Sequence, residues 1–368
     1  MNSKDFHDKI TFHETVPHSE QWHEFRGRGL GGSELAIIFG LTKYKSSARL
    51  FHEKVGTIQP HFIGNQYTLW GTVNEPMIRE MWRYWDGTPE GYIGNFQNKR
   101  VMREVRSVED YFATHEDYPW LFASIDGYIE VGGFNLATGE ELSKGGILEV
   151  KTMADYVANQ WEAGIPPAYI VQVHVYMLIY GLDYAEIAVL IGGNTFDVLP
   201  IERSESLTAK IIEASRLFWN KVERGRELFK AMGEAKISND TEAYEEAQAE
   251  LDNIEPPPDD TEDYTALMKE RFNKEIEVVA GDEVAERIAR EHKFIHAVIK
   301  KLEAKKSLKQ NQLIKILCDA RAEEIELTNG KITLRRNKKD QLRFSNGLRV
   351  VFEEKVIEDI VGKVVEVE

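Results

Sequence analysis

The spacing of apolar residues changes along the chain, and each change marks a predicted helix or strand. Between 70 and 85, apolar side chains such as Ile78, Met81, Trp82 and Trp85 recur every three or four residues, which is the spacing of one helix face. Shorter apolar runs, typical of strands, follow this segment. We expect two helices separated by a glycine-rich turn within 19–56, further helices over 70–85, 168–181, 206–232, 283–303 and 310–320, and strands over 92–96, 101–105, 123–129, 146–150, 186–191 and 195–201.

The order of these elements predicts an α/β protein in which helices flank a mixed sheet. Near the end of the chain, two alternating runs surround Asn329-Gly330, and this pattern is typical of a β-hairpin over 324–336. An acidic stretch at 234–263, which contains Pro256-Pro257-Pro258, is expected to form an exposed loop or a helix hairpin. We find no internal repeat.

Composition and cysteine content narrow the classes of protein that this chain can be. Its 368 residues are 42% hydrophobic, which is ample for a buried core. The single cysteine, Cys318, excludes an intrachain disulfide and a four-cysteine iron–sulfur site, and we expect a buried, inert thiol. No segment is long and apolar enough to cross a bilayer, and the polar N-terminus is unlike a signal peptide. These features predict a soluble, cytoplasmic protein that does not associate with membranes.

The charge of the chain is acidic overall but unevenly distributed. A net charge of −16 argues against nonspecific binding to polyanions. Much of the excess acid lies in 234–263, whereas the last third carries Lys305-Lys306, Arg335-Arg336 and Lys338-Lys339. A local basic channel is therefore compatible with the acidic total.

Candidate chemistry is concentrated in two strand-like runs, which contain Asp126 and the segment from Glu149 to Lys151. Alternate side chains of a strand share a face, so Glu149 and Lys151 point one way and Val150 points into a core. If the two strands pair as a hairpin, Asp126 reaches the same face. Two carboxylates, a backbone carbonyl and an ammonium group then form a site for a hard divalent cation and an attacking water. Taken alone, the Glu149/Lys151 pair is typical of a surface ion pair, and Asp126 is typical of a turn.

Three further segments carry polar side chains in positions that suit a site. Glu75 lies on the helix predicted over 70–85, and Gln172 lies on the apolar helix predicted over 168–181. Arg26 precedes Gly31-Gly32, after which Ser33 suits the N-cap of the next helix.

The ordered motifs W-H-x-x-R…G-G-S-E, G-x-x-x-E, S-x-D-G, E-V-K and Q-x-H-x-Y-M, which span 22–177, resemble those of the YqaJ-type viral recombinases. These are relatives of phage lambda exonuclease within the PD-(D/E)XK nuclease superfamily. One departure is Ile125, which occupies the place of the proline in the superfamily's name. The resemblance implies a restriction-endonuclease-like α/β core at 1–203, a helical extension at 204–320 with an acidic insertion near 234–263, and a C-terminal β-hairpin and tail at 321–368.

The activity that this resemblance implies is magnesium-dependent hydrolysis of DNA phosphodiesters. The enzyme would digest one strand of linear duplex processively, from 5′ to 3′, and leave 3′ single-stranded overhangs for phage-type recombination. Mg²⁺ would be the cofactor, and Mn²⁺ would substitute for it. The resemblance assigns metal ligation to Asp126, Glu149, the backbone carbonyl of Val150 and, directly or through water, Glu75, and it assigns the positioning or activation of the attacking water to Lys151.

The resemblance also implies partners and a grip on the DNA end. Gln172 would orient the active site, while Arg26 and Ser33 match the pair that holds a terminal 5′-phosphate. Double-stranded DNA with a free end would be the substrate, bound by a homo-oligomeric ring such as a trimer. A single-strand annealing protein would be a partner, and the protein would act in the cytoplasm of a bacterial cell as a phage or prophage product.

Other interpretations of the same residues stay open at the sequence level. A RecB-like nuclease without an iron–sulfur cluster, a restriction-type endonuclease, a junction resolvase and a catalytically inactive DNA-binding scaffold are the main alternatives. Taken without the resemblance, Gln172 is a buried hydrogen-bonding residue, Arg26 a surface cation and Gly31-Gly32 a tight turn. His174 on the apolar helix is interpreted as a core histidine. Digestion of linear against circular DNA would separate the exonuclease from the endonucleases.

Overall fold

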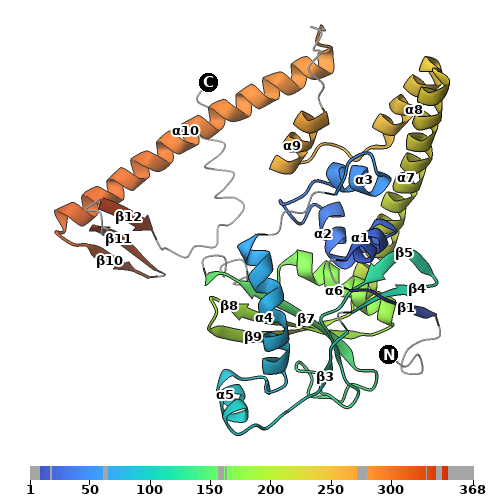
Figure 1. The fold of residues 1–368 in the computed structure, drawn as a ribbon. Helices are drawn as coiled ribbons and strands as arrows, with labels where there is room; N and C mark the ends of the chain where they lie inside the picture. Colours follow the sequence, from blue (N-terminus) through green and yellow to red (C-terminus); the bar gives the residue numbers. More distant parts are fainter. Residues whose placement is uncertain are drawn as a thin grey trace. The chain divides into compact units, whose positions relative to one another are not determined.

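The computed structural model describes two compact units, 1–273 and 274–368, and each is treated by itself (Figure 1). No described helix combines the length and the apolar content that a membrane span requires. The residues that the structure describes are 9–16, 19–60, 65–108, 110–155, 161, 164–271, 280–328, 330–336 and 342–346.

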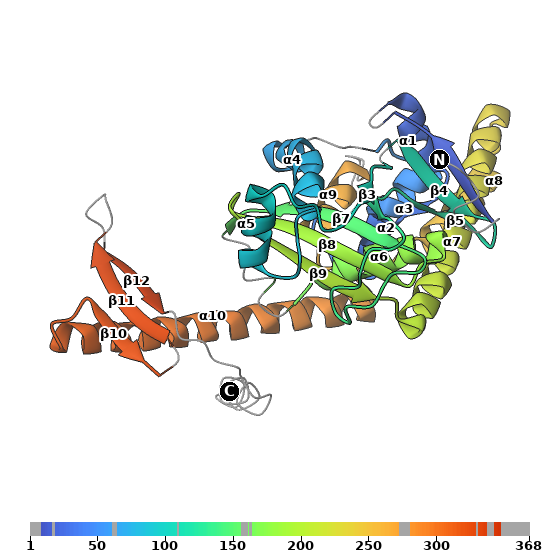
Figure 2. The ribbon, with the colours of Figure 1, turned by 90° about the horizontal axis from the view of Figure 1, so that it is seen from below.

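A five-stranded mixed sheet forms the centre of the first unit, with the order β3-β6-β7-β8-β9. Figure 2 shows β7, β8 and β9 of this sheet side by side. Strands β7 and β8 are parallel, and the other neighbours are antiparallel. A parallel pair needs a crossover, and helix α6 (Pro167–Tyr180) makes it. The predicted mixed sheet flanked by helices is therefore confirmed. The strands are β3 (Val105–Arg106), β6 (Gly127–Ile129), β7 (Gly146–Met153), β8 (Tyr184–Ile191) and β9 (Thr195–Glu202).

The two faces of β7 belong to different hydrophobic clusters. Ile147 packs in the same cluster as Val173 and Met177 of α6. Leu148 and Val150 pack in the cluster that contains Trp82 of α4 (Gln66–Trp82). Because side chains alternate along a strand, residue 149 shares the α6 face with Ile147.

A buried polar cluster ties the C-terminal end of α4 to this sheet. Glu186 of β8 is fully buried and accepts hydrogen bonds from Trp82 Nε1 at 2.6 Å, Arg103 Nη1 at 2.5 Å and Tyr184 Oη at 2.6 Å. The Arg103 guanidinium also lies 4.0 Å from the centroid of the Trp82 ring. The helix predicted to carry Glu75 is thereby anchored at its far end.

A second, four-stranded sheet has the order β1-β4-β5-β2, and its short β2 pairs in parallel with β5. A Cβ on Gly31 would lie 2.8 Å from the Phe122 ring, and one on Gly32 would lie 2.7 Å from the Tyr176 ring. Glycine at both positions therefore allows β2 and the next helix to pack closely on β5 and α6. The elements are β1 (Ile10–Glu14), α1 (Glu20–Gly27), β2 (Leu30–Gly31), α2 (Gly32–Ile38), β4 (Tyr111–His115) and β5 (Tyr118–Ala123).

Local predictions are wrong at four places. Of the strand predicted over 101–105, only Val105 lies in a strand, β3. Ser33 is not an N-cap: Gly31 caps α2, because Glu34 Oε2 reaches back to accept the Gly31 N–H at 2.9 Å. Residues 92–96 belong to helix α5 (Pro89–Gln97), where Thr88 caps the first turn and a proline at the first position favours the helix. The two helices predicted over 283–303 and 310–320 form one helix, α10 (Glu283–Asp319).

The acidic stretch at 234–263 is largely a helix hairpin, as one of the two alternatives predicted. Helix α7 (Glu205–Ser238) turns into α8 (Thr241–Ile254), and Ala235, Ala247 and Leu251 are buried. A loop then leads to α9 (Glu262–Arg271).

Acidic residues that follow this hairpin bind the start of α3 (Ser47–Val55). Asp263 Oδ2 accepts the Ser46 N–H at 2.9 Å, and Asp259 Oδ2 accepts the Ser47 N–H at 3.2 Å. Arg49 makes two hydrogen bonds to Glu270, at 2.9 and 3.0 Å. These carboxylates accept hydrogen bonds from the free amides of the helix N-terminus, and their negative charge compensates the positive end of the helix dipole. The acidic segment is therefore part of the first unit.

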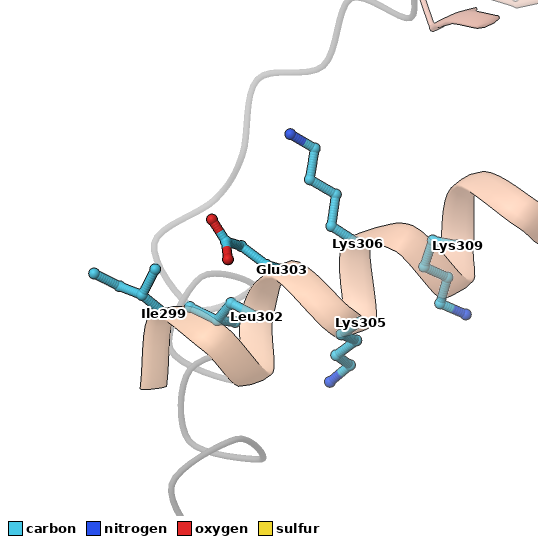
Figure 3. Close-up of a pocket in the computed structure, with 6 residues that line it drawn as sticks. All are labelled: Ile299, Leu302, Glu303, Lys305, Lys306 and Lys309. Atoms are coloured by element: carbon cyan, nitrogen blue, oxygen red, sulfur yellow. The ribbon is translucent and has the colours of Figure 1, made fainter. Parts of the chain in front are cut away.

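The second unit consists of α10 and a three-stranded sheet, β10 (Glu324–Leu327), β11 (Gly330–Arg336) and β12 (Leu342–Asn346). The predicted hairpin is confirmed, with Leu327 paired to Gly330, and β12 extends it. Leu317 of α10 is buried, whereas Cys318 is exposed, so the prediction of a buried thiol is wrong. Figure 3 shows side chains of the middle turns of α10 that line a hollow: Ile299, Leu302, Glu303, Lys305, Lys306 and Lys309.

Candidate active site

The pairing of β6 with β7 brings the predicted acids together. Gly127 pairs with Leu148 and Tyr128 with Ile147 in antiparallel register, so the residue before Gly127 lies opposite Glu149. Asp126 Oδ2 accepts the backbone N–H of Val150 at 2.7 Å. The hairpin on which the sequence argument depended is present, and Asp126 reaches the segment that carries Glu149 and Lys151.

Glu149 is almost fully buried, with 2% of its surface exposed. Its Oε1 atom accepts hydrogen bonds from Lys151 Nζ and, at 2.6 Å, from Gln172 Nε2 of α6. Its Oε2 atom is buried and has no hydrogen-bond partner among the described residues. A buried carboxylate oxygen without a donor is costly, so this atom needs a proton or a cation.

The pKa values of Glu149 and Lys151 reflect the same need for a proton or a cation at Glu149. Burial raises the pKa of the Glu149 carboxyl to about 8, and the nearby Asp126 charge adds to the rise, against Lys151 and Gln172. Burial would lower the pKa of Lys151, but the negative charges of Glu149 and Asp126 outweigh it and raise that pKa. The metal-free site therefore favours a proton on Glu149 beside a charged ammonium group.

Two tyrosines of α6 support this cluster, and the sequence argument did not assign them a role. Gln172 Nε2 donates a second hydrogen bond to Tyr176 Oη at 2.9 Å, so both of its amide hydrogens are used. Lys151 Nζ lies 5.1 Å from the centroid of the Tyr169 ring. Tyr169 lies three residues before Gln172 and Tyr176 lies four residues after it, so all three side chains share one face of the helix. This spacing in the sequence could have predicted that the tyrosines lie near Gln172.

Glu75 lies on α4, which packs against β7. It precedes Arg79 by one turn of α4, and Arg79 Nη1 donates a hydrogen bond to the backbone carbonyl of Asp126 at 2.8 Å. Within the described ranges, no three His, Cys, Asp or Glu side chains form a group that could hold a metal ion. Asp126 and Glu149 converge, whereas Glu75 stands outside direct three-carboxylate ligation.

Arg26 lies in the last turn of α1, and Ser33 lies in the first turn of α2. The Arg26 guanidinium is 4.8 Å from the centroid of the Trp22 ring and 3.3 Å from Glu34 Oε1, and it is about one quarter exposed. Ser33 is exposed at the second position of α2.

The segment that carries Arg26 and Ser33 packs against the face of α6 that carries Gln172 and Tyr176. An added Cβ on Gly32 would meet the Gln172 carbonyl at 2.8 Å. Burial, followed by the charges of Glu149 and Asp126, raises the pKa of the Tyr176 hydroxyl, and Arg26 opposes this rise. Arg26 therefore acts electrostatically on the same cluster as the acids.

His174 of α6 serves the fold, as predicted. It is 2% exposed, its Nδ1 donates to the Ile170 carbonyl at 2.7 Å, and its Nε2 accepts the Ser204 N–H at 3.0 Å.

The sequence comparisons concern the segment that carries these residues. Residues 21–183 match the family model described as the YqaJ-like viral recombinase domain. This part of the chain is a YqaJ-like viral recombinase domain. The predicted family is thereby confirmed, and the YqaJ-like domain contains every candidate site residue from Arg26 to Gln172.

A curated relative and two solved structures extend the comparison. The chain is 31% identical over 204 residues to the uncharacterized protein YqaJ of Bacillus subtilis (strain 168), and it spans about half of that relative's length, 55% of each chain. An alkaline exonuclease from Laribacter hongkongensis is 20% identical, with 60% of this chain and 100% of that chain covered and a TM-score of 0.45. A phage related exonuclease from Haemophilus somnus 129PT is 14% identical, with 53% and 94% covered and a TM-score of 0.33.

Proposed function

We propose that the protein is a Mg²⁺-dependent exonuclease that digests one strand of linear double-stranded DNA from 5′ to 3′ and leaves 3′ overhangs for recombination. The observation that carries the proposal is the convergence of Asp126 and Glu149 on one face beside Lys151, with a buried Glu149 oxygen that lacks a donor. A nuclease needs such a face for the phosphodiester, its metal and a water.

The residues present fit a hard divalent cation. Oxygen ligands suit Mg²⁺, and Glu149 Oε2, Asp126 and the Val150 carbonyl would hold it, with Glu75 acting through water. When bound, the ion would supply positive charge that stabilises the charge developing on the phosphate oxygens, and it would lower the pKa of bound water. Gln172 fixes Glu149 Oε1 and so leaves Oε2 for ligation. The Lys151 ammonium group, which can only donate, would donate a hydrogen bond to the attacking water and so hold it in place.

The end of the DNA would be recognised by Arg26 and Ser33. A guanidinium group can contact two phosphate oxygens at once, and a terminal phosphate carries more charge than an internal diester. The Arg26 side chain is partly exposed and stacked on Trp22, which limits its freedom before DNA binds. A homo-oligomeric ring and a single-strand annealing partner complete the proposal, in a phage or prophage setting within the bacterial cytoplasm.

A single assay tests the proposal: digestion of linear 5′-phosphorylated duplex and of covalently closed circular DNA under different metal conditions. Mg²⁺ and Mn²⁺ should support digestion of the linear substrate alone. Ca²⁺ should bind without supporting turnover, because its longer and looser coordination does not hold water in line. Full turnover with a chelator, or efficient cutting of the closed circle, would contradict the proposal.

The raised pKa of Glu149 predicts that protons and Mg²⁺ compete. The folded, metal-free protein keeps a proton on Glu149 up to about pH 8, whereas the unfolded chain releases it near the ordinary glutamate pKa. This contribution to stability is therefore present at low pH and is lost as the pH rises through about 8. Thermal unfolding with Mg²⁺ should show a larger stabilisation at about pH 9 than at about pH 6. Glu149→Gln should remove the difference, and an equal Mg²⁺ effect at both pH values in the unmodified protein would refute the competition.

A further inference from the structure

Cations from two distant elements hold the loop that carries Arg26. We call residues 26–31, which run from the last turn of α1 through β2, the Arg26 loop. Lys54 Nζ of α3 donates hydrogen bonds to the Arg26 carbonyl at 2.6 Å and to the Gly29 carbonyl at 2.8 Å. Arg226 Nη2 of α7 donates to the Gly27 carbonyl at 2.7 Å. The loop carbonyls are thus turned toward cationic side chains, and the loop backbone is fixed by α3 and α7.

The same ammonium group shares a carboxylate with Arg26. Lys54 Nζ lies 2.9 Å from Glu34 Oε2, and Arg26 Nη2 lies 3.3 Å from Glu34 Oε1. Lys54 is 6% exposed, and so is largely withdrawn from water. Burial would raise the pKa of the Glu34 carboxyl, but Lys54, Arg26 and the Gly31 amide lower it below its usual value. Glu34 is therefore an ionised carboxylate that two cations neutralise together.

We propose that Lys54 is a positioning residue for the terminal phosphate: it fixes the Arg26 loop and neutralises Glu34, which leaves the Arg26 guanidinium available to DNA. This inference rests on the proposed function, in which Arg26 grips the 5′-phosphate. It goes beyond that function because it assigns the availability of Arg26 to a buried side chain that does not contact DNA.

The physical reason is a competition between Glu34 and phosphate for one guanidinium group. Without Lys54, Arg26 would be the nearest cation to a poorly solvated carboxylate. Attraction between charges strengthens as the local dielectric falls, and an arginine–carboxylate pair is strongest when two hydrogen bonds form. Arg26 would then move from its single 3.3 Å contact toward a closer pair with Glu34. Fewer N–H donors of the guanidinium group would then be available to an incoming phosphate.

The test measures binding of two otherwise identical duplexes, one with a 5′-phosphate and one with a 5′-hydroxyl, by fluorescence anisotropy in Ca²⁺ so that cleavage does not interfere. Lys54→Met should reduce the preference for the phosphorylated end by about tenfold, the loss expected when a charge-assisted contact is weakened. The double variant Lys54→Met/Glu34→Gln should recover most of the preference, because no carboxylate then competes for Arg26. Lys45→Met is the matched control, since Lys45 pairs with Glu53 at 2.6 Å rather than with the loop; it should leave the preference unchanged.

The outcomes separate this inference from the proposed function. An unmodified protein without any preference for a 5′-phosphate overturns the end-recognition part of the proposed function and the inference with it. A normal preference in the unmodified protein that survives intact in a folded Lys54→Met variant overturns the inference alone, as does a double variant with no recovery. If Lys54→Met does not fold, Glu34→Gln alone decides: release of Arg26 should raise the preference, and an unchanged or lower preference overturns the inference.

Discussion

Glu149→Gln should abolish cleavage of linear duplex DNA while leaving the protein folded. The substitution keeps the size of the side chain, but it replaces one carboxylate oxygen with an amide nitrogen that cannot ligate a cation, and it removes the negative charge that faces the buried Oε2 position. Metal ions contribute several kcal/mol to phosphoryl transfer, so the rate should fall by about three orders of magnitude or more. The measurement is the initial rate of nucleotide release from a 5′-phosphorylated duplex in saturating Mg²⁺.

Asp126→Asn should have a similar effect, and a surface carboxylate provides the control. Glu140→Gln removes a carboxylate from an exposed position just before β7, and it should leave the rate unchanged. Glutamine resembles the protonated carboxyl that the metal-free site favours at position 149, so the metal-free variant should unfold at the same temperature or higher. A rate near that of the unmodified protein in either acid variant would refute the proposed active site.

Arg26→Ala should slow the digestion of 5′-phosphorylated duplex by about ten- to a hundredfold, the effect of losing a charge-assisted contact worth roughly 1.5–3 kcal/mol. Digestion of the same duplex with a 5′-hydroxyl should change far less, because the contact is made mainly to the terminal phosphate. The measurement is the ratio of kcat/KM values for the two substrates.

The ratio distinguishes end recognition from a structural role. Arg26 also stacks on Trp22 and pairs with Glu34, so its loss could weaken the fold locally. Equal losses on both substrates would assign Arg26 to the fold or to general DNA binding. Arg26→Lys offers a second comparison, since it keeps the charge but cannot form a bidentate contact.

The strand alternation was sufficient to predict the centre of the site. Because side chains of a strand alternate strictly, Glu149 and Lys151 had to share a face, and one hairpin assumption placed Asp126 beside them. The structure contains that hairpin. Gln172 followed from a motif on a helix whose apolar pattern was unmistakable.

Other features of the structure depend on contacts that the spacing of residues along the sequence does not predict. The cap of α2 depends on a glutamate that reaches backward three residues, which a preference for serine at caps does not reveal. The strand predicted at 92–96 failed because Thr88 and Pro89 start a helix there, and local capping outweighed aromatic strand propensity. The contacts of Lys54 to the Arg26 loop join residues 25 and 28 positions apart, beyond the reach of any periodicity.

The binding of acidic residues to α3 has a consequence for biosynthesis. Arg49 and its partner Glu270 are separated by 221 residues, and α7 also packs on α3. At a ribosomal speed of about 5–20 residues per second, roughly 10–45 s pass between the synthesis of the two partners. For most of that interval α3 has neither its capping carboxylates nor its helical neighbour α7. The YqaJ-like domain therefore completes its fold only after the acidic segment has left the ribosome. The synthesis of Asp126, Glu149 and Lys151 thus precedes the moment at which the fold around them is complete.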